Sequence, residues 1–300
     1  MEEHITEQAN PATLHIDAMD SLGIVTTINT EDQLVAGAVQ KVLPNIARAV
    51  DIIVERMKKG GRLLYFGSGT SGRLGILDAS ECPPTFGVDK SLVQGFIAGG
   101  KPAITCSIEG AEDNEEQGAS DAKKAKVTEK DTVVGITASG QAPYVLAVLK
   151  YAKEKGAATL GVCNVENPKL AAYSLAVINP IVGPEAISGS TRMKAGTSQK
   201  MVLNMLSTAT MIHLGKTYGN LMIDMIATNN KLRKRAIRIV TQVARVDEKA
   251  ATEALGRCKW NTKTAIVSLL LRCPIDEASS ALTQVGGAVS KALELYKPVR

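Results

Sequence analysis

Two turns rich in glycine, serine and threonine contain the residue types best suited to binding a phosphate. The first turn, Gly67–Gly72, follows the apolar run Leu63–Phe66, and the second, Thr137–Gln141, follows the apolar run that begins at Thr132. Backbone N–H groups and hydroxyls at the start of a helix favour a bound anion. The candidate ligands come from both turns: Ser68, Thr70, Ser71, Ser139, Gly140 and Gln141.

The first turn departs from the common nucleotide-binding patterns. No Lys-Ser/Thr pair follows its glycines, as a Walker A loop requires, and the acidic residue of a dinucleotide fingerprint is missing at the expected place. A small phosphate monoester needs only hydroxyls and N–H groups at a helix start. Either turn alone could be an ordinary connection between a strand and a helix. Two such turns on adjacent strand ends favour a ligand site.

Two glutamates are the candidate acid and base. Glu81 lies between apolar or small neighbours just before Pro83-Pro84, and Glu112 follows Gly110-Ala111, which leaves room beside the chain. Two carboxylates in one cleft can divide acid and base roles when their environments differ. Their spacing does not show that they meet. Most acidic side chains are solvated surface charges, which is the alternative for the other candidates: Asp78, Glu109, Asp113, Glu115, Glu116 and Glu185.

Arg192 and Lys194 lie near the start of a long predicted helix, where they could complete an anion site or simply be surface cations. A metal site is not expected, because the three histidines are far apart in the sequence. The five cysteines are widely spaced without a C-x-x-C pair, which predicts reduced thiols in a cytoplasmic protein.

The elements that must position these residues follow an alternating pattern. Short apolar runs predict strands at Leu63–Phe66, Leu92–Ile97, Thr132–Thr137, Ala158–Val162 and Leu175–Ile178. Helical segments between them are expected at Ser71–Ser80, near 112–126, at Pro143–Glu154, and as a short turn near Asn167–Ala172. Alternating strands and helices predict an α/β fold with a doubly wound, mainly parallel five-stranded sheet, whose ligands bind at the carboxyl ends of the strands.

Helices are also expected before and after this sheet region in the sequence. A capping box at Thr30–Gln33 predicts a helix start, and Pro44 predicts a division into two helices before Gly60. A long helix over 191–214 has a methionine stripe typical of a core or a dimer interface. Further helices are expected at 220–227, 230–245, 247–257, 261–271, 274–283 and 286–296, with Asn261 as an N-cap and Pro274 in a first turn.

This pattern predicts three parts. Residues 1–60 form an arm and helices, 61–240 the sheet domain that binds a sugar phosphate, and 241–300 a small helical bundle.

The net charge of +5 is mild, and its densest run, Lys231–Arg235, is typical of a solvated helix face, so nucleic acid is not an expected partner. No window reaches the ~18 apolar residues that a membrane span needs, and the acidic start lacks the apolar core of a signal peptide.

Several motifs together resemble the N-acetylmuramic acid 6-phosphate etherases, which are sugar isomerase (SIS) domain proteins. The resemblance covers nearly the whole chain, in order, and part of it extends to the longer glucokinase-regulatory proteins. The motifs that carry it are Gly69–Gly75 with Asp78–Thr85, Ile108–Asp113, Ser190–Thr197 and Gly219–Met222.

The resemblance implies an enzyme that cleaves the D-lactyl ether of N-acetylmuramic acid 6-phosphate by elimination and water addition. Its products would be N-acetylglucosamine 6-phosphate and D-lactate, in cell-wall recycling, with no metal or other cofactor. Carried onto this chain, Glu81 is the proton donor to the departing lactate and Glu112 is the base at C2. The C-terminal bundle resembles a ubiquitin-associated-type (UBA-like) fold, and a homodimer is expected. An aldose–ketose isomerase and a non-catalytic sugar-phosphate sensor remain the alternatives.

Overall fold

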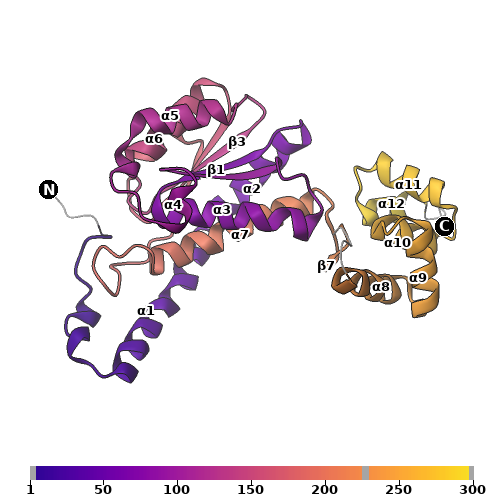
Figure 1. The fold of residues 1–300 in the computed structure, drawn as a ribbon, viewed down its shortest axis with the longest axis horizontal. Coiled ribbons are helices and arrows are strands. Elements are labelled where there is room, and N and C mark those ends of the chain that lie inside the picture. Colours follow the sequence, from indigo (N-terminus) through magenta and orange to yellow (C-terminus); the bar gives the residue numbers. More distant parts are fainter. Residues whose placement is uncertain (1–4, 225–229, 297–300) are drawn as a thin grey trace. The chain divides into compact units, whose positions relative to one another are not determined.

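The computed structural model describes residues 5–224 and 230–296, which divide into two compact units (Figure 1). The sheet unit consists of the chain up to Ser80 together with Lys90–Ser207. The helical unit consists of Glu81–Asp89 together with the chain from Thr208 onward. The predicted boundary at residues 240 and 241 falls inside a helix of the helical unit.

The sheet unit is built on five parallel strands in the order β2-β1-β3-β4-β5. This arrangement confirms the predicted doubly wound parallel sheet. Gly67, Ile97 and Ile136 are paired at the carboxyl end of three adjacent strands, so the turns that follow β1 and β3 leave the same edge. The strands are β1 (Leu63–Gly67), β2 (Val93–Ile97), β3 (Thr132–Ile136), β4 (Ala158–Val162) and β5 (Ala176–Ile178).

Alternation of side chains along β1 places helices on both faces of the sheet. Leu64 and Phe66 belong to the hydrophobic cluster that contains the buried residues of α6 (Pro143–Glu154), which lies beside α5 (Glu115–Lys124) (Figure 1). Tyr65 points the other way, toward α3 (Gly69–Phe86), where a Cβ atom on Gly75 would lie 2.9 Å from the Tyr65 Cβ. Both faces of β1 are therefore covered, as continuous apolar strands predict.

The remaining elements of the sheet unit surround this core. They are the 3₁₀ turns η1 (Pro11–Thr13), η2 (Ile16–Ala18), η3 (Ala111–Asp113) and η4 (Lys169–Tyr173), and the helices α1 (Ser21–Lys41), α2 (Leu43–Lys58), α4 (Pro102–Thr105) and α7 (Lys194–His213), whose last residues belong to the helical unit. The predicted division near Pro44 is confirmed, because Pro44 lies in the first turn of α2, where its missing N–H costs nothing.

Two predicted helix ends in this part of the chain are wrong. Helix α1 begins at Ser21 rather than at the Thr30–Gln33 box, because the side chain of Asp20 caps it by accepting from the Gly23 N–H at 2.8 Å. Thr30 instead donates to the Thr26 carbonyl within the helix. Helix α3 continues through Pro83 and Pro84 to Phe86, and the Gly87 N–H donates to the Pro83 carbonyl at its end.

Besides the ends of α3 and α7, the described residues of the helical unit form a short hairpin and a series of helices. The hairpin is β6 (Thr217–Tyr218) with β7 (Leu221–Met222), and the helices are α8 (Asn230–Ala244), α9 (Glu248–Arg257), α10 (Thr262–Leu271), α11 (Ile275–Gln284) and α12 (Val289–Leu295). The predicted helix at 220–227 is wrong where it is described, because β7 occupies its start, and its last three residues lie outside the described residues. Asn261 caps α10 as predicted, whereas Pro274 is the N-cap of α11 rather than a first-turn residue.

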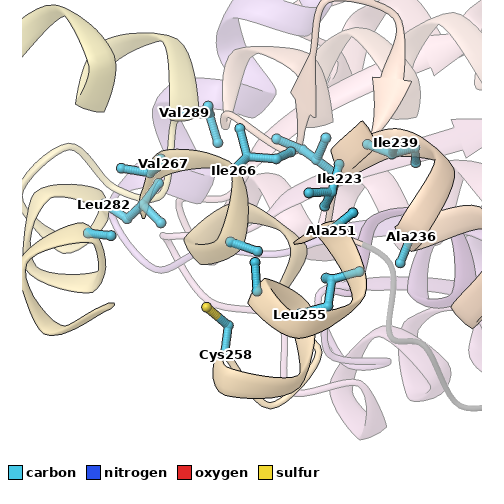
Figure 2. Close-up of a cluster of buried hydrophobic side chains, with 14 of the residues drawn as sticks. Ile223, Ala236, Ile239, Ala251, Leu255, Cys258, Ile266, Val267, Leu282 and Val289 are labelled. Carbon is cyan, nitrogen blue, oxygen red and sulfur yellow. The ribbon is translucent and has the colours of Figure 1, made fainter. Parts of the chain in front are cut away.

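An aliphatic core holds the helical unit together. Figure 2 shows side chains such as Leu255, Ile266 and Val267 gathered between its helices, and all three are fully buried. The 81–89 segment packs on the hairpin region, since a Cβ atom on Gly87 would lie 1.9 Å from the Asp224 carbonyl oxygen. Lys263 forms a buried ion pair with Asp224 at 2.7 Å, and burial lowers the pKa of this lysine.

Within the described ranges, no helix is long and apolar enough to cross a membrane. Those ranges also contain no group of three or more histidine, cysteine or acidic side chains that could hold a metal ion.

Candidate active site

The first turn closes so tightly that only glycine fits at its two ends. A Cβ atom on Gly67 would lie 2.7 Å from the Gly72 nitrogen, and one on Gly72 would lie 2.6 Å from the Cγ1 of Ile97. Gly69 also has a positive φ of 50°. This geometry brings β1 and the first turn of α3 together around Ser68, so the hydroxyls and N–H groups at the start of α3 lie at the carboxyl edge of the sheet.

The second turn has the same relation to β3. Gly140 adopts a φ of +68°, and a Cβ atom there would lie 2.5 Å from the Pro168 Cβ, so a side chain would collide with the loop after β4. The hydroxyls of Thr137 and Ser139 lie 3.2 Å apart and share a hydrogen bond. The turn therefore presents its hydroxyls in a fixed arrangement.

Both turns line one polar cavity of about 240 Å³. Four predicted phosphate ligands meet there together with the predicted base, Glu112, whereas Gly140, Gln141, Arg192 and Lys194 are not among the described residues that line it. The N-terminal arm (residues 5–20) contributes Thr6 and Glu7, and the loop before α7 contributes Gly189 and Thr191. The hydroxyls supplied by the two turns are those of Ser68, Thr70, Ser71, Thr137 and Ser139.

Glu112 reaches this cavity from η3. The preceding Gly110 has a φ of +67°, which turns the chain into the short helix. Ser68 donates to Oε2 of Glu112 at 3.4 Å, and the guanidinium of Arg73 donates to the carbonyls of Ile104 and Cys106 at 3.0 Å each. Arg73 thus attaches the loop before η3 to α3. Glu112, Ser68 and Gly69 also line a second cavity of about 240 Å³ beside the first.

Glu81 lies on the same helix as the first turn but belongs to the helical unit. It is exposed on α3, two residues before Pro83. Ser71 and Glu81 are therefore connected by one continuous helix. A meeting of Glu81 with Glu112 stays a prediction.

A buried chain of amides supports the first turn, and the sequence reasoning missed it. Ser71 donates to Oε1 of Gln199 at 2.7 Å, and Gln199 donates to Oδ1 of Asn164 at 2.9 Å. Asn164 then donates to the Ser198 hydroxyl at 2.7 Å. The position of Asn164 just beyond the strand at Ala158–Val162 was the available signal, because polar residues at carboxyl strand ends mark ligand sites in such sheets.

At the start of α7, two backbone N–H groups and the Lys194 ammonium are bound by carboxylates of the same chain. Glu185 accepts from the Lys194 and Ala195 N–H groups at 2.8 and 2.9 Å, and burial raises the pKa of Glu185. The ammonium of Lys194 is buried against Glu31 at 2.5 Å. Burial opposes ionisation of Glu31, but hydrogen bonds from Lys194 and Asn10 hold its pKa below the usual value. Arg192 is exposed. Phosphate binding by Arg192 or Lys194 stays a prediction.

Asp78, another acidic residue of α3, is a buried carboxylate with its hydrogen bonds satisfied. It accepts from the Tyr65 hydroxyl at 3.0 Å, from the Asn204 amide at 2.8 Å and from the Ser207 hydroxyl at 3.0 Å. Burial raises its pKa despite these partners. These contacts join β1, α3 and α7, so Asp78 connects the elements that carry the site.

Models of known families match three stretches of the chain. Residues 45–153 match the glucokinase regulatory protein N-terminal SIS domain, residues 111–209 match the SIS domain, and residues 219–264 match the C-terminal lid domain of glucokinase regulatory protein. A solved phosphoheptose isomerase from Francisella tularensis has a TM-score of 0.44 and 16% identity, over 64% of this chain and 98% of that chain.

Curated relatives match over nearly the whole length. The N-acetylmuramic acid 6-phosphate etherase of Clostridium beijerinckii is 51% identical, over 96% of this chain and 95% of the relative. That of Escherichia coli O1:K1 / APEC is 52% identical, over 98% of this chain and 99% of the relative. With half of its residues identical to these enzymes from end to end, this chain belongs to the N-acetylmuramic acid 6-phosphate etherase family.

Proposed function

We propose that the chain cleaves the D-lactyl ether of N-acetylmuramic acid 6-phosphate in cell-wall amino-sugar recycling. The products are N-acetylglucosamine 6-phosphate and D-lactate. The observation that carries the proposal is the polar cavity, which combines hydroxyls and N–H groups suited to a phosphate with the carboxylate of Glu112. The end-to-end identity to etherases supports this substrate over other sugar phosphates.

The phosphate binds at the first and second turns. Ser68, Thr70 and Ser139 offer hydroxyls, and the start of α3 offers N–H groups together with the positive end of the helix dipole. The hydroxyl proton of Ser71 is directed to Gln199, so Ser71 contributes through its backbone. Gly140, Gln141 and Arg192 are further proposed ligands of the phosphate. Lys194, bound to Glu31, holds the start of α7 in place.

Glu112 removes the C2 proton of the open-chain sugar, and Glu81 protonates the ether oxygen at C3. The C2 proton is acidic only when C1 is an aldehyde. The lactyl group leaves readily only when its ether oxygen is protonated, so that it departs as D-lactate. Loss of both groups gives an α,β-unsaturated aldehyde, and water then adds at C3. General acid and general base catalysis each contribute about 10²–10⁴-fold. The elimination releases lactate and the addition consumes water, and neither step changes the overall oxidation state, so the reaction requires no redox cofactor.

An aldose–ketose isomerase would use the same cavity and a carboxylate at C2, but it would need no acid directed at C3. Product analysis separates the two functions. We expect D-lactate in equal amount to the sugar phosphate product, with solvent oxygen at C3 when the reaction runs in labelled water. A ketose phosphate without lactate would contradict the proposal.

Substitution of the two glutamates tests their roles. Glu81→Gln and Glu112→Gln should each lower kcat by about 10²–10⁴-fold while sugar-phosphate binding persists. Glu116→Gln, an exposed neighbour on α5, is the matched control and should leave turnover unchanged. Full turnover in either Glu81→Gln or Glu112→Gln would refute the role assigned to that residue, and a sensor protein would tolerate both.

The proposed assembly is a homodimer in the cytoplasm. Leu22, Val25 and Leu34 on α1 are 72%, 58% and 56% exposed, which supports burial of this helix against a second copy. The five cysteines are all free thiols, which supports a reducing compartment. Light scattering should give twice the chain mass, and a Leu22→Glu/Val25→Glu variant should shift the protein toward a monomer. A monomeric parent protein would contradict the homodimer.

A further inference from the structure

Two residues of the N-terminal arm, Thr6 and Glu7, line the polar cavity, and the arm is attached on both sides of Glu7. Before it, Ile5 packs against the hydrophobic cluster between the sheet and α6. After it, the amide of Asn10 donates to the Pro184 carbonyl at 3.1 Å and to Glu31 at 2.7 Å. Glu7 therefore lies on a short segment whose two ends are held, which restricts where its side chain can go.

The backbone of this segment also binds the loop before α7. The Gly189 N–H donates to the Thr6 carbonyl at 3.1 Å, and the Ser188 hydroxyl donates to the Gln8 carbonyl at 3.2 Å. A Cβ atom on Gly189 would lie 3.1 Å from Oε2 of Glu7, so the carboxylate lies directly against that glycine. Thr6 is buried, and both Thr6 and Glu7 line the cavity. The arm is thus a wall of the cavity.

The chemistry of a carboxylate limits what Glu7 can contact. A phosphate dianion repels it, whereas hydroxyl groups are hydrogen-bond donors that an ionised carboxylate accepts strongly. The phosphate has its own donors in the two turns, which come from other parts of the chain. Glu7 is therefore suited to the sugar portion of a ligand whose phosphate occupies the turns.

We propose that Glu7 is a specificity-determining residue of the substrate site, whose carboxylate accepts hydrogen bonds from hydroxyl groups of the sugar. The proposal rests on the proposed function, because it takes a phosphorylated sugar as the ligand. It extends that function by giving the N-terminal arm a direct part in recognising the sugar. A charge-assisted hydrogen bond of this kind typically changes affinity about ten- to hundredfold.

The test compares Glu7→Ala and Glu7→Gln with the parent protein. Calorimetry measures the affinity for N-acetylglucosamine 6-phosphate, and displacement of that ligand measures the affinity for inorganic phosphate. We expect Glu7→Ala to lose about ten- to hundredfold for the sugar phosphate with unchanged inorganic phosphate binding. Glu7→Gln, which keeps an acceptor oxygen and the side-chain shape, should lose less. Asp17→Asn, an exposed charge of the same arm on η2, is the matched control and should bind both ligands normally.

The kinetic readout separates recognition from other roles. Glu7→Ala should raise KM for the lactyl ether substrate and leave kcat within a few-fold. Three results would overturn the proposal: unchanged affinity for the sugar phosphate, an equal loss for inorganic phosphate, or a loss confined to kcat, which would indicate a proton donor. Absence of lactate release by the parent protein would instead refute the proposed function, while a sugar-selective loss on Glu7→Ala would still support sugar binding.

Discussion

The sheet unit and the helical unit differ in where their buried polar side chains gather. The core of the helical unit is aliphatic, with Leu255, Ile266 and Val267 at its centre (Figure 2). The helical unit also buries Lys263 in an ion pair with Asp224. The sheet unit instead gathers several buried polar side chains near the carboxyl edge of its strands, including the Lys194–Glu31 ion pair. A buried polar group costs free energy unless it is paired, so such a group is more informative than another aliphatic contact. This grouping indicates that the sheet unit positions the polar cavity, whereas the aliphatic cluster stabilises the helical unit.

The largest expected effect comes from breaking the ion pair of the sheet unit. Lys194→Met leaves the Glu31 carboxylate buried without its cation, and the free energy of unfolding should fall by about 3–5 kcal/mol in urea denaturation. Adding Glu31→Gln to that variant should restore part of the loss, because the unpaired charge disappears. If Lys194 instead binds the phosphate, the double variant would recover stability but lose sugar-phosphate affinity.

The comparison predicts a purely structural effect in the helical unit. Leu255→Ala removes a fully buried side chain and should lower the free energy of unfolding by about 2–5 kcal/mol through the cavity it leaves. Affinity for N-acetylglucosamine 6-phosphate, measured well below the unfolding temperature, should not change, since the polar cavity is lined by the sheet unit. A parallel loss of affinity would show that ligand binding by the sheet unit also depends on the core of the helical unit. Leu270→Ala, at a more exposed position of α10, is the control.

A smaller effect is expected in the amide chain behind the first turn. Gln199→Ala leaves Ser71 and Asn164 without a buried partner and should cost about 1–3 kcal/mol of stability. Because Ser71 belongs to the first turn, sugar-phosphate affinity should fall as well. Thermal unfolding and calorimetry on the same sample measure both quantities. Lost stability with full affinity would mean that the amides support the fold but not the turn.

The smallest effect on stability is expected for a substitution of Asp131, which lies just before β3 at the amino edge of the sheet. Asp131 pairs with Arg62 at 2.7 Å, and although burial opposes ionisation, hydrogen bonds from Arg62 and the Thr128 N–H lower the pKa of Asp131. A lowered carboxyl pKa contributes stability above the unfolded-state pKa of about 4, and this contribution is lost as the pH falls through the folded-state value. The stability difference between the parent protein and Asp131→Asn should therefore shrink as the pH decreases below about 4. Sugar-phosphate affinity at neutral pH should be equal in both. A difference in stability that is independent of pH would contradict this account.

The local pattern predicted most of the fold because each element carries its own signal. The strands at Leu63–Phe66, Thr132–Thr137 and Ala158–Val162 lie where short apolar runs indicated, since parallel strands buried on both faces must be apolar throughout. The errors occurred where a local signal had a competitor. Asp20 caps α1 ten residues before the expected capping box, and α3 continues through two prolines to Phe86, beyond its predicted end at Ser80.

The candidate site was predicted only in part, for a physical reason. Ser68, Thr70 and Ser71 are neighbours in the sequence, so their turn could be recognised without a structure. Glu31 and Lys194 are 163 residues apart, and Ser71 and Gln199 are 128 apart, so no local pattern could indicate that they meet.

The sequence by itself determined the order of the five sheet strands along the chain, the two phosphate-type turns and the family, because these depend on residue type and on spacing over a few positions. Only the tertiary structure decided that both turns, Glu112 and the N-terminal arm line one cavity. It also decided that the ammonium of Lys194 is bound to Glu31. Those arrangements depend on which distant segments pack together, and such packing is a property of the whole folded unit.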